Sequence, residues 1–144
     1  MAKLPVHWIE ARTYCHATEE EERVERALAF AFREGETKRA ILEGHFGNSL
    51  VRLSRRVDDA SAIRAVWTKW SATNLPSIIG KDLDARVDEE GILHFRLDKQ
   101  AAFLEEIQLA GDSDAIDVRL KLMAFPAKQE QARQVARKIL SGAL

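Results

Sequence analysis

The sequence predicts an α+β fold, with a single mixed or antiparallel sheet of about five strands and helices packed on one face. Segments in which apolar and polar residues alternate are typical of half-buried strands, and apolar residues at every third or fourth position are typical of helices. Both patterns occur here. Along the chain, strands often follow strands without a crossover helix between them, which favours α+β over an alternating α/β fold.

Alternation predicts the strands directly. In the first strand the odd-numbered positions from His7 to Cys15 are expected to face the core, because successive side chains point to opposite faces. The second and third strands flank a short Gly/Asn connection, which is typical of a hairpin. The five predicted strands span residues 6–17, 39–46, 50–57, 92–98 and 116–125.

Three longer helices and some shorter ones are expected between the strands. Thr18, followed by Glu21 three residues later, is a capping-box pattern and predicts the start of the first helix. The second helix is expected to begin at Asp58 and Asp59, and the last to span about residues 127–141. Shorter helical segments are expected within residues 77–86 and 99–108.

The composition is that of an ordinary globular protein. Of 144 residues, 46% are apolar and 31% charged, which excludes a wholly disordered chain and predicts one domain over residues 1–144. The 22 basic and 23 acidic residues give a net charge of −1, so a basic surface requires charge to be segregated between faces. Neither a signal peptide nor a membrane-spanning apolar run is seen, and the single cysteine suits a reducing compartment. We therefore expect a cytoplasmic protein without membrane contact.

The outward face of the predicted sheet is the candidate functional surface. Six basic residues are expected there against three acidic ones, Glu10, Glu43 and Asp117. Basic side chains interleaved with aromatic ones neutralise phosphates and stack on bases, so this pattern predicts binding of single-stranded RNA. An alternative is an exposed sheet whose charges merely pair across strands. The candidate RNA-binding residues are Arg12, Tyr14, His16, His45, Arg52, Arg56, His94, Arg96, Lys99, Arg119 and Lys121.

The segment 96–100 admits two interpretations. In one, Asp98 caps the following turn while Lys99 meets solvent. In the other, Arg96 and Lys99 both contact phosphates.

Four segments of the chain together resemble a known family. They are HWIEARTYCHATEEEERV (7–24), ILEGHFGNSLVRL (41–53), LHFRLDKQAAF (93–103) and VRLKLMAFPAK (118–128). In this order they are similar to an archaeal family of predicted RNA-binding proteins and predicted exosome subunits, whose fold is similar to that of the ribosomal protein that binds 5S rRNA. The resemblance implies an α+β fold and an RNA partner. It also implies a non-catalytic accessory role in RNA processing or degradation, alongside exosome- or ribosome-related proteins.

The histidines leave a second hypothesis open, a metal-free ribonuclease. His16, His45 and His94 could approach one another on the outward face, and imidazoles suit acid–base catalysis. Cys15 and His16 are adjacent and point to opposite faces, which is no metal-motif spacing. We therefore predict no catalytic residue, no metal site and no cofactor, and expect Cys15 to be a small core residue.

A third hypothesis is a structural adaptor that docks on a protein assembly through its sheet or helix face. Trp67 and Trp70 fit the apolar stripe of a helix and are expected in the core. Trp8 has the same parity as Arg12 and is expected outside, where an exposed tryptophan at an edge also suits a homodimer contact.

Overall fold

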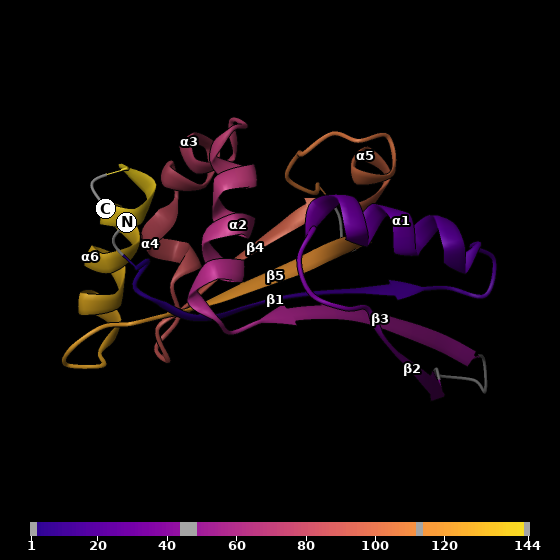
Figure 1. Cartoon of the computed structure of the whole chain (residues 1–144), viewed down its shortest axis with the longest axis horizontal. Coiled ribbons are helices and arrows are strands. Elements are labelled where there is room, and N and C mark those ends of the chain that lie inside the picture. The colour runs from indigo at the N-terminus through magenta and orange to yellow at the C-terminus, as the bar shows by residue number, and fades with distance from the viewer. Residues whose placement is uncertain (1–2, 44–48, 112–113, 143–144) are drawn as a thin grey trace. The chain divides into compact units, whose positions relative to one another are not determined.

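The structure is a computed structural model, and it describes residues 3–43, 49–111 and 114–142. The five strands form one antiparallel sheet in the order β2-β3-β1-β5-β4 (Figure 1). The predicted α+β class with a single sheet is therefore confirmed. In chain order the elements are β1 (Val6–Cys15), α1 (Glu21–Ala31), β2 (Lys38–Glu43), β3 (Ser49–Val57), α2 (Ala60–Ser71), α3 (Leu75–Gly80), α4 (Leu83–Arg86), β4 (Ile92–Asp98), α5 (Lys99–Phe103), β5 (Ala115–Leu122) and α6 (Gln129–Leu140).

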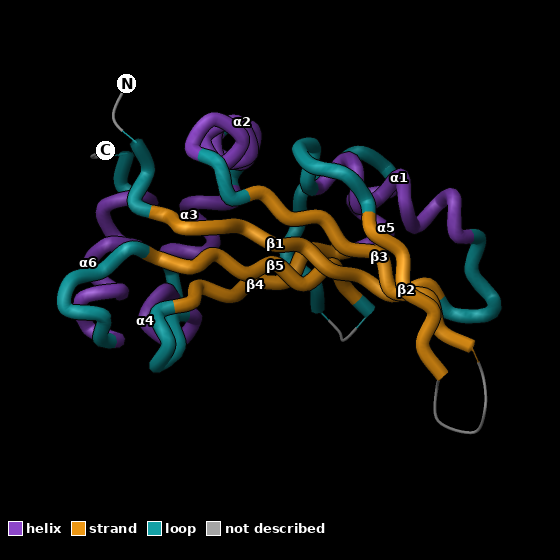
Figure 2. The backbone as a smooth tube through the Cα atoms, turned by 60° about the horizontal axis from the view of Figure 1, so that its bottom comes forward, coloured by secondary structure: helices purple, strands orange, loops and turns teal. Residues whose placement is uncertain are grey.

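The chain forms two compact units. The first unit comprises Met1–Ile9, Val57–Phe95 and Arg119–Leu144, and the second unit comprises Glu10–Arg56 and Arg96–Val118. Strands β1, β3, β4 and β5 contribute residues to both units, β3 only Val57 to the first. The first unit contains α2, α3, α4 and α6, the second contains α1 and α5, and in each the helices lie to one side of the strands (Figure 2). The expectation of a single domain over residues 1–144 stays a prediction.

Aromatic residues of α2 form the centre of the first unit. Trp67 and Trp70 are 6% and 2% exposed, which confirms that they belong to the core. The Trp70 ring meets Phe95 of β4 edge-on, with ring centroids 5.4 Å apart, an arrangement that the aromatic quadrupole favours. The helix begins where predicted, since the Asp59 carboxylate accepts a hydrogen bond from the Ala62 amide at 3.0 Å. Among the described helices, none is long and apolar enough to span a bilayer.

The second unit buries one face of α1 against its strands. Val24, Ala27, Leu28 and Ala31 are all buried, at the spacing that places them on a single helix face. Helix α1 also packs against α5. Among the described residues of this unit, no helix lies on the opposite face of the strands (Figure 2).

Two local predictions are wrong. Helix α1 begins at Glu21 with Glu20 as its N-cap, because residues 16–19 form a separate turn in which the Glu19 amide bonds the His16 carbonyl at 2.9 Å. Thr18 is therefore not the cap. His7, expected in the core, is exposed. Two non-buried residues, His7 and Trp8, separate buried Val6 from buried Ile9, so alternation slips by one position as it does at a β-bulge.

Candidate nucleic-acid interface

One face of the strands of the second unit is not covered by any helix that the structure describes, and it carries several of the candidate residues. On β1, Arg12 and Tyr14 are half-buried, while the residues between and beside them are buried under the helices. On β3, Arg52 is half-buried and Arg56 exposed, whereas Leu53 between them is buried. Alternation therefore predicted their orientation correctly. We call this surface the open face; it comprises Arg12, Tyr14, Lys38, Arg52, Arg56, Arg96 and Asp117.

Lys38 is a member of the open face that the sequence analysis missed. In the β2–β3 hairpin, Lys38 lies opposite Ser54 and Ala40 lies opposite Arg52, and directly opposed residues share a face of the sheet. By the same register, Glu43 lies opposite Ser49 and on the other face. The expected outward position of Glu43 is therefore wrong. His45 lies outside the described residues.

Two carboxylates partly neutralise the positive charge of the open face. The Arg96 guanidinium contacts Asp117 of the neighbouring strand at 2.9 Å, with both side chains about half exposed. The terminal amino group of Arg12 lies 3.3 Å from Glu10 on the same strand. Arg52 makes no ion pair with any of the described residues. The Arg96–Asp117 pair is exposed and therefore weak, so a phosphate can compete for Arg96. The Arg12–Glu10 pair is more buried, with side chains 35% and 16% exposed.

The remaining sheet candidates lie in the first unit. The Arg119 guanidinium stacks over the Trp8 ring at 5.6 Å from its centroid, and the Lys121 ammonium donates to the Glu90 carbonyl. Their side chains are half-buried. Both cations are thus already engaged within their own unit.

His94, also in the first unit, is tied to Asp88. Its Nε2 lies 2.6 Å from the Asp88 carboxylate. Burial of this carboxylate would raise its pKa, but the hydrogen bond from His94 and the amides of Ile92 and Glu90 outweigh it, so the Asp88 pKa is lowered. One oxygen of Asp88 holds the turn before β4 by accepting from the Glu90 and Ile92 amides, and the other contacts His94, so His94 is not an isolated imidazole.

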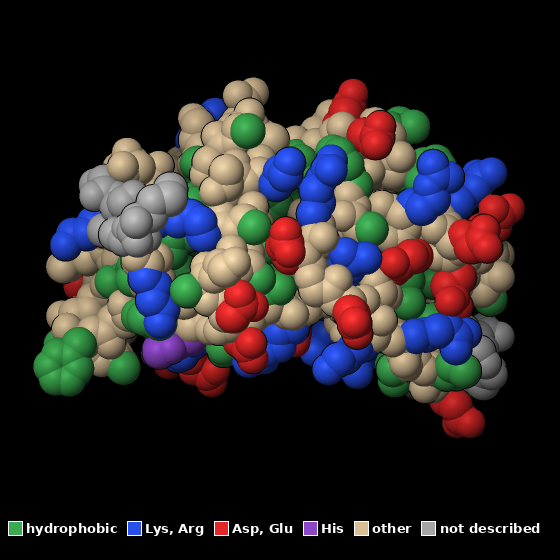
Figure 3. Space-filling view, viewed as in Figure 1, with side chains coloured by type: hydrophobic (Ala, Val, Ile, Leu, Met, Phe, Trp, Pro, Cys, Tyr) green, Lys and Arg blue, Asp and Glu red, His purple; other side chains and the backbone are tan. Residues whose placement is uncertain are grey.

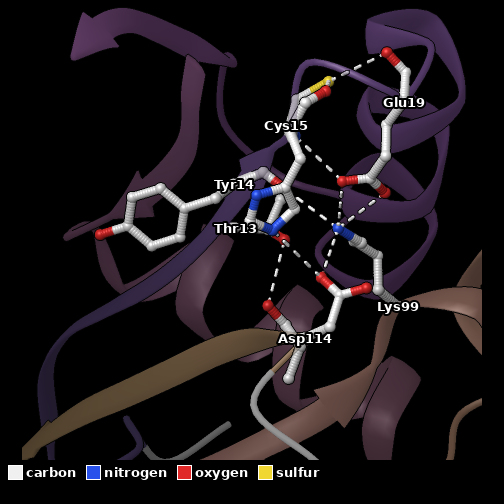
Figure 4. A network of polar contacts seen from close by, with 8 residues as sticks. Thr13, Tyr14, Cys15, Glu19, Lys99 and Asp114 are labelled. Atoms are coloured by element: carbon white, nitrogen blue, oxygen red, sulfur yellow. Dashed lines mark hydrogen bonds and ion pairs between the residues drawn. The ribbon is translucent and has the colours of Figure 1, made fainter. Parts of the chain in front are cut away.

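Lys99 contradicts the expectation that it meets solvent. Its side chain is only 2% exposed, and its ammonium lies 2.9 Å from Glu19 and 2.7 Å from Asp114. It also donates to the Tyr14 carbonyl at 3.0 Å (Figure 4). The reason is local: Asp98 caps α5 by accepting from the Ala101 amide at 2.8 Å, and this start directs Lys99 inward. We call Lys99, Glu19 and Asp114 the buried lysine cluster.

The charge state of this cluster follows from its contacts. Burial alone would lower the pKa of Lys99, but the hydrogen bonds and charges of Asp114 and Glu19 outweigh it, so the pKa is raised. Lys99 is therefore charged and internally neutralised, which removes it from the candidate phosphate contacts. Next to it, the buried Cys15 thiol has a raised pKa because of burial and the nearby Glu19 charge, so it is a poor nucleophile.

The same cluster contains a potential set of metal ligands. Ligand atoms of His16, Glu19 and Asp114 lie within 4.8 Å of one another. The Lys99 ammonium, however, bridges the two carboxylates (Figure 4), so a cation is already part of the site. His16 itself is exposed and stands 3.8 Å from Asp114, while His94 belongs to the other unit.

The helix side of the second unit is not a purely acidic surface opposite a basic sheet. It carries charges of both signs. Around α1 in Figure 3, red and blue side chains alternate. Arg23 pairs with Glu20 at 3.1 Å, and both Arg23 and Arg26 lie over the Phe103 ring of α5. Glu21 binds Arg39 of β2 at 2.9 Å. The acidic residues at the start of α1 are thus largely paired.

Known proteins are similar to this chain over nearly its whole length. A family model described as RNA binding matches residues 8–122. The chain is 32% identical to an RNA-binding protein of Pyrococcus abyssi, over 97% of each protein. Two solved DUF54 structures are also similar. That from Archaeglobus fulgidus has a TM-score of 0.84 and 31% identity, covering 93% of this chain and 99% of the other. That from Methanothermobacter thermautotrophicus has a TM-score of 0.80 and 34% identity, covering 94% and 98%.

Proposed function

Because the chain belongs to this RNA-binding family, we propose that it binds single-stranded RNA through the open face of its second unit. The observation that carries the proposal is a strand surface that no described helix covers, with basic side chains from four strands: Lys38 from β2, Arg52 and Arg56 from β3, Arg12 from β1 and Arg96 from β4. Tyr14 supplies an aromatic ring among them.

The chemistry of this surface suits an extended polyanion. Guanidinium groups neutralise phosphates and release counterions, which makes binding strong at low salt and largely independent of sequence. Tyr14 offers a ring on which an unpaired base can stack, and such stacking contributes about 1–3 kcal/mol per base. His16, exposed after the end of β1, extends the polar margin of the surface. In the first unit, His94, Arg119 and Lys121 are further candidates, although each already contacts a neighbour in that unit: Asp88, Trp8 and the Glu90 carbonyl.

Binding is the whole of the proposed activity. We expect the protein to act as an accessory to RNA processing or degradation, beside exosome- or ribosome-related proteins, and to leave the RNA intact. Two observations support this. The sequence resembles a family of RNA-binding proteins, and two groups that could take part in catalysis already have partners: Lys99 is neutralised by Glu19 and Asp114, and His94 is bonded to Asp88.

A salt titration with matched double variants tests the site. Arg52→Ala/Arg96→Ala removes two charges from the open face, and Arg23→Ala/Arg26→Ala removes two from the α1 side of the same unit. Fluorescence anisotropy with a mixed-sequence single-stranded RNA gives log Kd at several salt concentrations. We expect the open-face variant to lower the slope by about 1.4, at about 0.7 per lost phosphate contact, and the α1 variant to leave it unchanged.

An unchanged slope in the open-face variant, with native circular dichroism, contradicts the proposal. Equal losses in both variants would indicate non-specific charge attraction. Weak, salt-insensitive RNA binding by the unmodified protein would instead favour the adaptor hypothesis.

The ribonuclease hypothesis is tested on the same RNA. After prolonged incubation with the purified protein in a chelator, we expect full-length RNA on a denaturing gel. Cleavage that disappears in a His16→Ala variant would favour the ribonuclease over the binding protein.

A further inference from the structure

The two outer edges of the sheet differ in how they are covered. Along β4, the edge is occupied by isolated bridges, Val87 with Leu93 in the first unit and Leu97 with Leu109 in the second. The Asp98 amide also bonds the Gln108 carbonyl at 2.8 Å. Strand β2 forms the other edge, and within the described residues no backbone group pairs with its outer side.

Strand β2 has no proline, bulge or covering segment among the described residues, and its protection is limited to its short length and the charges of Lys38, Arg39 and Glu43. Edge strands commonly carry a proline or a bulge, or are covered by another segment, because unpaired amides and carbonyls template further pairing. The six residues of β2, KRAILE, contain no proline and pair without interruption with β3. Ile41 in its middle is 64% exposed, which makes it one of the few large apolar side chains that the described residues leave in solvent.

The sequence of β2 is complementary to itself. If two copies meet in antiparallel orientation about a two-fold axis at Ile41, then Ile41 lies opposite its own copy. Arg39 then lies opposite Glu43 of the second copy, twice, and Ala40 lies opposite Leu42. In each opposed pair the two residue numbers are both odd or both even. Their side chains therefore point to the same face of the sheet, as antiparallel pairing requires. The register joins opposite charges and an apolar pair, both of which stabilise cross-strand contacts.

The present partner of Arg39 is compatible with this register. Its contacts with Glu21 run through Nε, at 3.0 and 2.9 Å. The two terminal amino groups of the guanidinium therefore remain available for a second carboxylate, and a forked guanidinium binds two acids at once without strain.

We propose that the outer edge of β2 pairs with β2 of a second copy of this chain, with Ile41 on the two-fold axis. The axis is perpendicular to the sheet, so the open faces of the two second units lie on the same side. Only this consequence rests on the proposed function: the dimer would present two copies of the RNA-binding surface in one plane. A six-residue edge is small compared with a standard interface, so the association is weak and reversible.

Cysteine cross-linking tests the register in the absence of RNA. The background is Cys15→Ala, and single variants are Ile41→Cys, Ala40→Cys and Phe125→Cys. Opposed residues on paired strands stand about 4.5–5.5 Å apart between Cα atoms, within disulfide reach. Two copies of residue 40 are offset by two positions and are too far apart. Phe125 is 97% exposed and controls for random collision.

With mild oxidation by diamide, we expect the Ile41→Cys variant to give at least fivefold more dimer than either control. Equal cross-linking in all three variants, or none in any, overturns the proposal. More dimer from Ala40→Cys than from Ile41→Cys overturns the register.

A second measurement does not depend on engineered thiols. In sedimentation velocity at high concentration, we expect the unmodified chain to self-associate, and Glu43→Arg to weaken this at least threefold by placing like charges opposite each other. The isosteric Glu43→Gln should have a smaller effect. No difference between Glu43→Arg and the unmodified chain contradicts the proposal. The salt titration of RNA binding, run on Glu43→Arg at a concentration where sedimentation shows a monomer, separates a failure of the dimer from a failure of the RNA site.

Discussion

Two arginines on one strand of the second unit have opposite environments. Arg55 of β3 faces α1, where its side chain is 13% exposed and pairs with Glu25 at 3.3 Å. It also donates to the Thr37 hydroxyl at 2.8 Å and the Phe32 carbonyl at 3.1 Å. Arg52, three residues earlier, lies on the open face and makes no ion pair with any described residue.

The same contrast separates the lysines. Lys99, the first residue of α5, is buried and held by two carboxylates, whereas Lys38 of β2 is exposed at the margin of the open face. A buried cation needs every hydrogen bond satisfied, while a cation on a solvated sheet keeps its charge available. Burial among opposite charges, rather than the type of residue, separates structural cations from candidate ligand-binding ones.

The largest expected effect is that of Lys99→Met. Removing the ammonium leaves Glu19 and Asp114 as adjacent, uncompensated carboxylates, so we expect unfolding to become easier by about 2 kcal/mol. Their partial exposure to water keeps the cost below that of a fully buried pair. Urea unfolding gives the value, with Lys38→Met as the matched control, expected within about 0.5 kcal/mol. Equal losses of stability in the two variants would contradict the distinction between a structural lysine and an exposed one.

Arg55→Met is expected to cost about 1 kcal/mol of stability, because it removes the ion pair with Glu25 and the hydrogen bonds to the Phe32 carbonyl and the Thr37 hydroxyl. The methionine keeps most of the packing of the arginine stem. Its matched control is Arg52→Met, for which we expect almost no change in unfolding. The two variants should also differ in RNA binding, with a reduced salt slope for Arg52→Met and an unchanged slope for Arg55→Met. The reverse assignment would contradict the open-face site.

The stability that Lys99 contributes is expected to depend on alkaline pH. Because the pKa of Lys99 is raised above its ordinary value of 10.5, its stabilising contribution is complete below that pH and is lost as pH rises through the folded-state pKa. The stability difference between the unmodified protein and Lys99→Met should therefore be constant from pH 7 to 9 and shrink at higher pH. Urea unfolding across this series measures it. A difference that grows with pH would contradict the assigned charge state.

The smallest expected effect concerns Asp117→Asn. This change removes the carboxylate that faces Arg96 on the open face while keeping its shape. The Arg96 guanidinium is then no longer neutralised by a carboxylate and can bind a phosphate more strongly. We therefore expect RNA affinity to rise about twofold, or about 0.4 kcal/mol, with stability almost unchanged. Fluorescence anisotropy at fixed salt detects this, and Asp84→Asn, in the first unit, is the charge-matched control. A loss of affinity would show that Arg96 needs Asp117 to orient it.

The sequence by itself determined the sheet, the strand ranges to within a few residues, and the outward orientation of Arg12, Arg52 and Arg96. It could do so because the two-residue period of a strand is local: neighbouring residues alone establish which side chains share a face. The caps at Asp59 and Asp98 were predictable for the same reason, since each bonds an amide three residues later.

Only the tertiary structure decided the burial and the partners of Lys99 and Arg55, and the face of the sheet on which Lys38 lies. Lys99 meets Glu19 across 80 residues of sequence, and Arg55 meets Glu25 across 30. Lys38 joins the open face through the register of its hairpin. No local pattern contains these partners, because a charged side chain is buried only where distant segments supply its opposite charge, and folding alone brings those segments together.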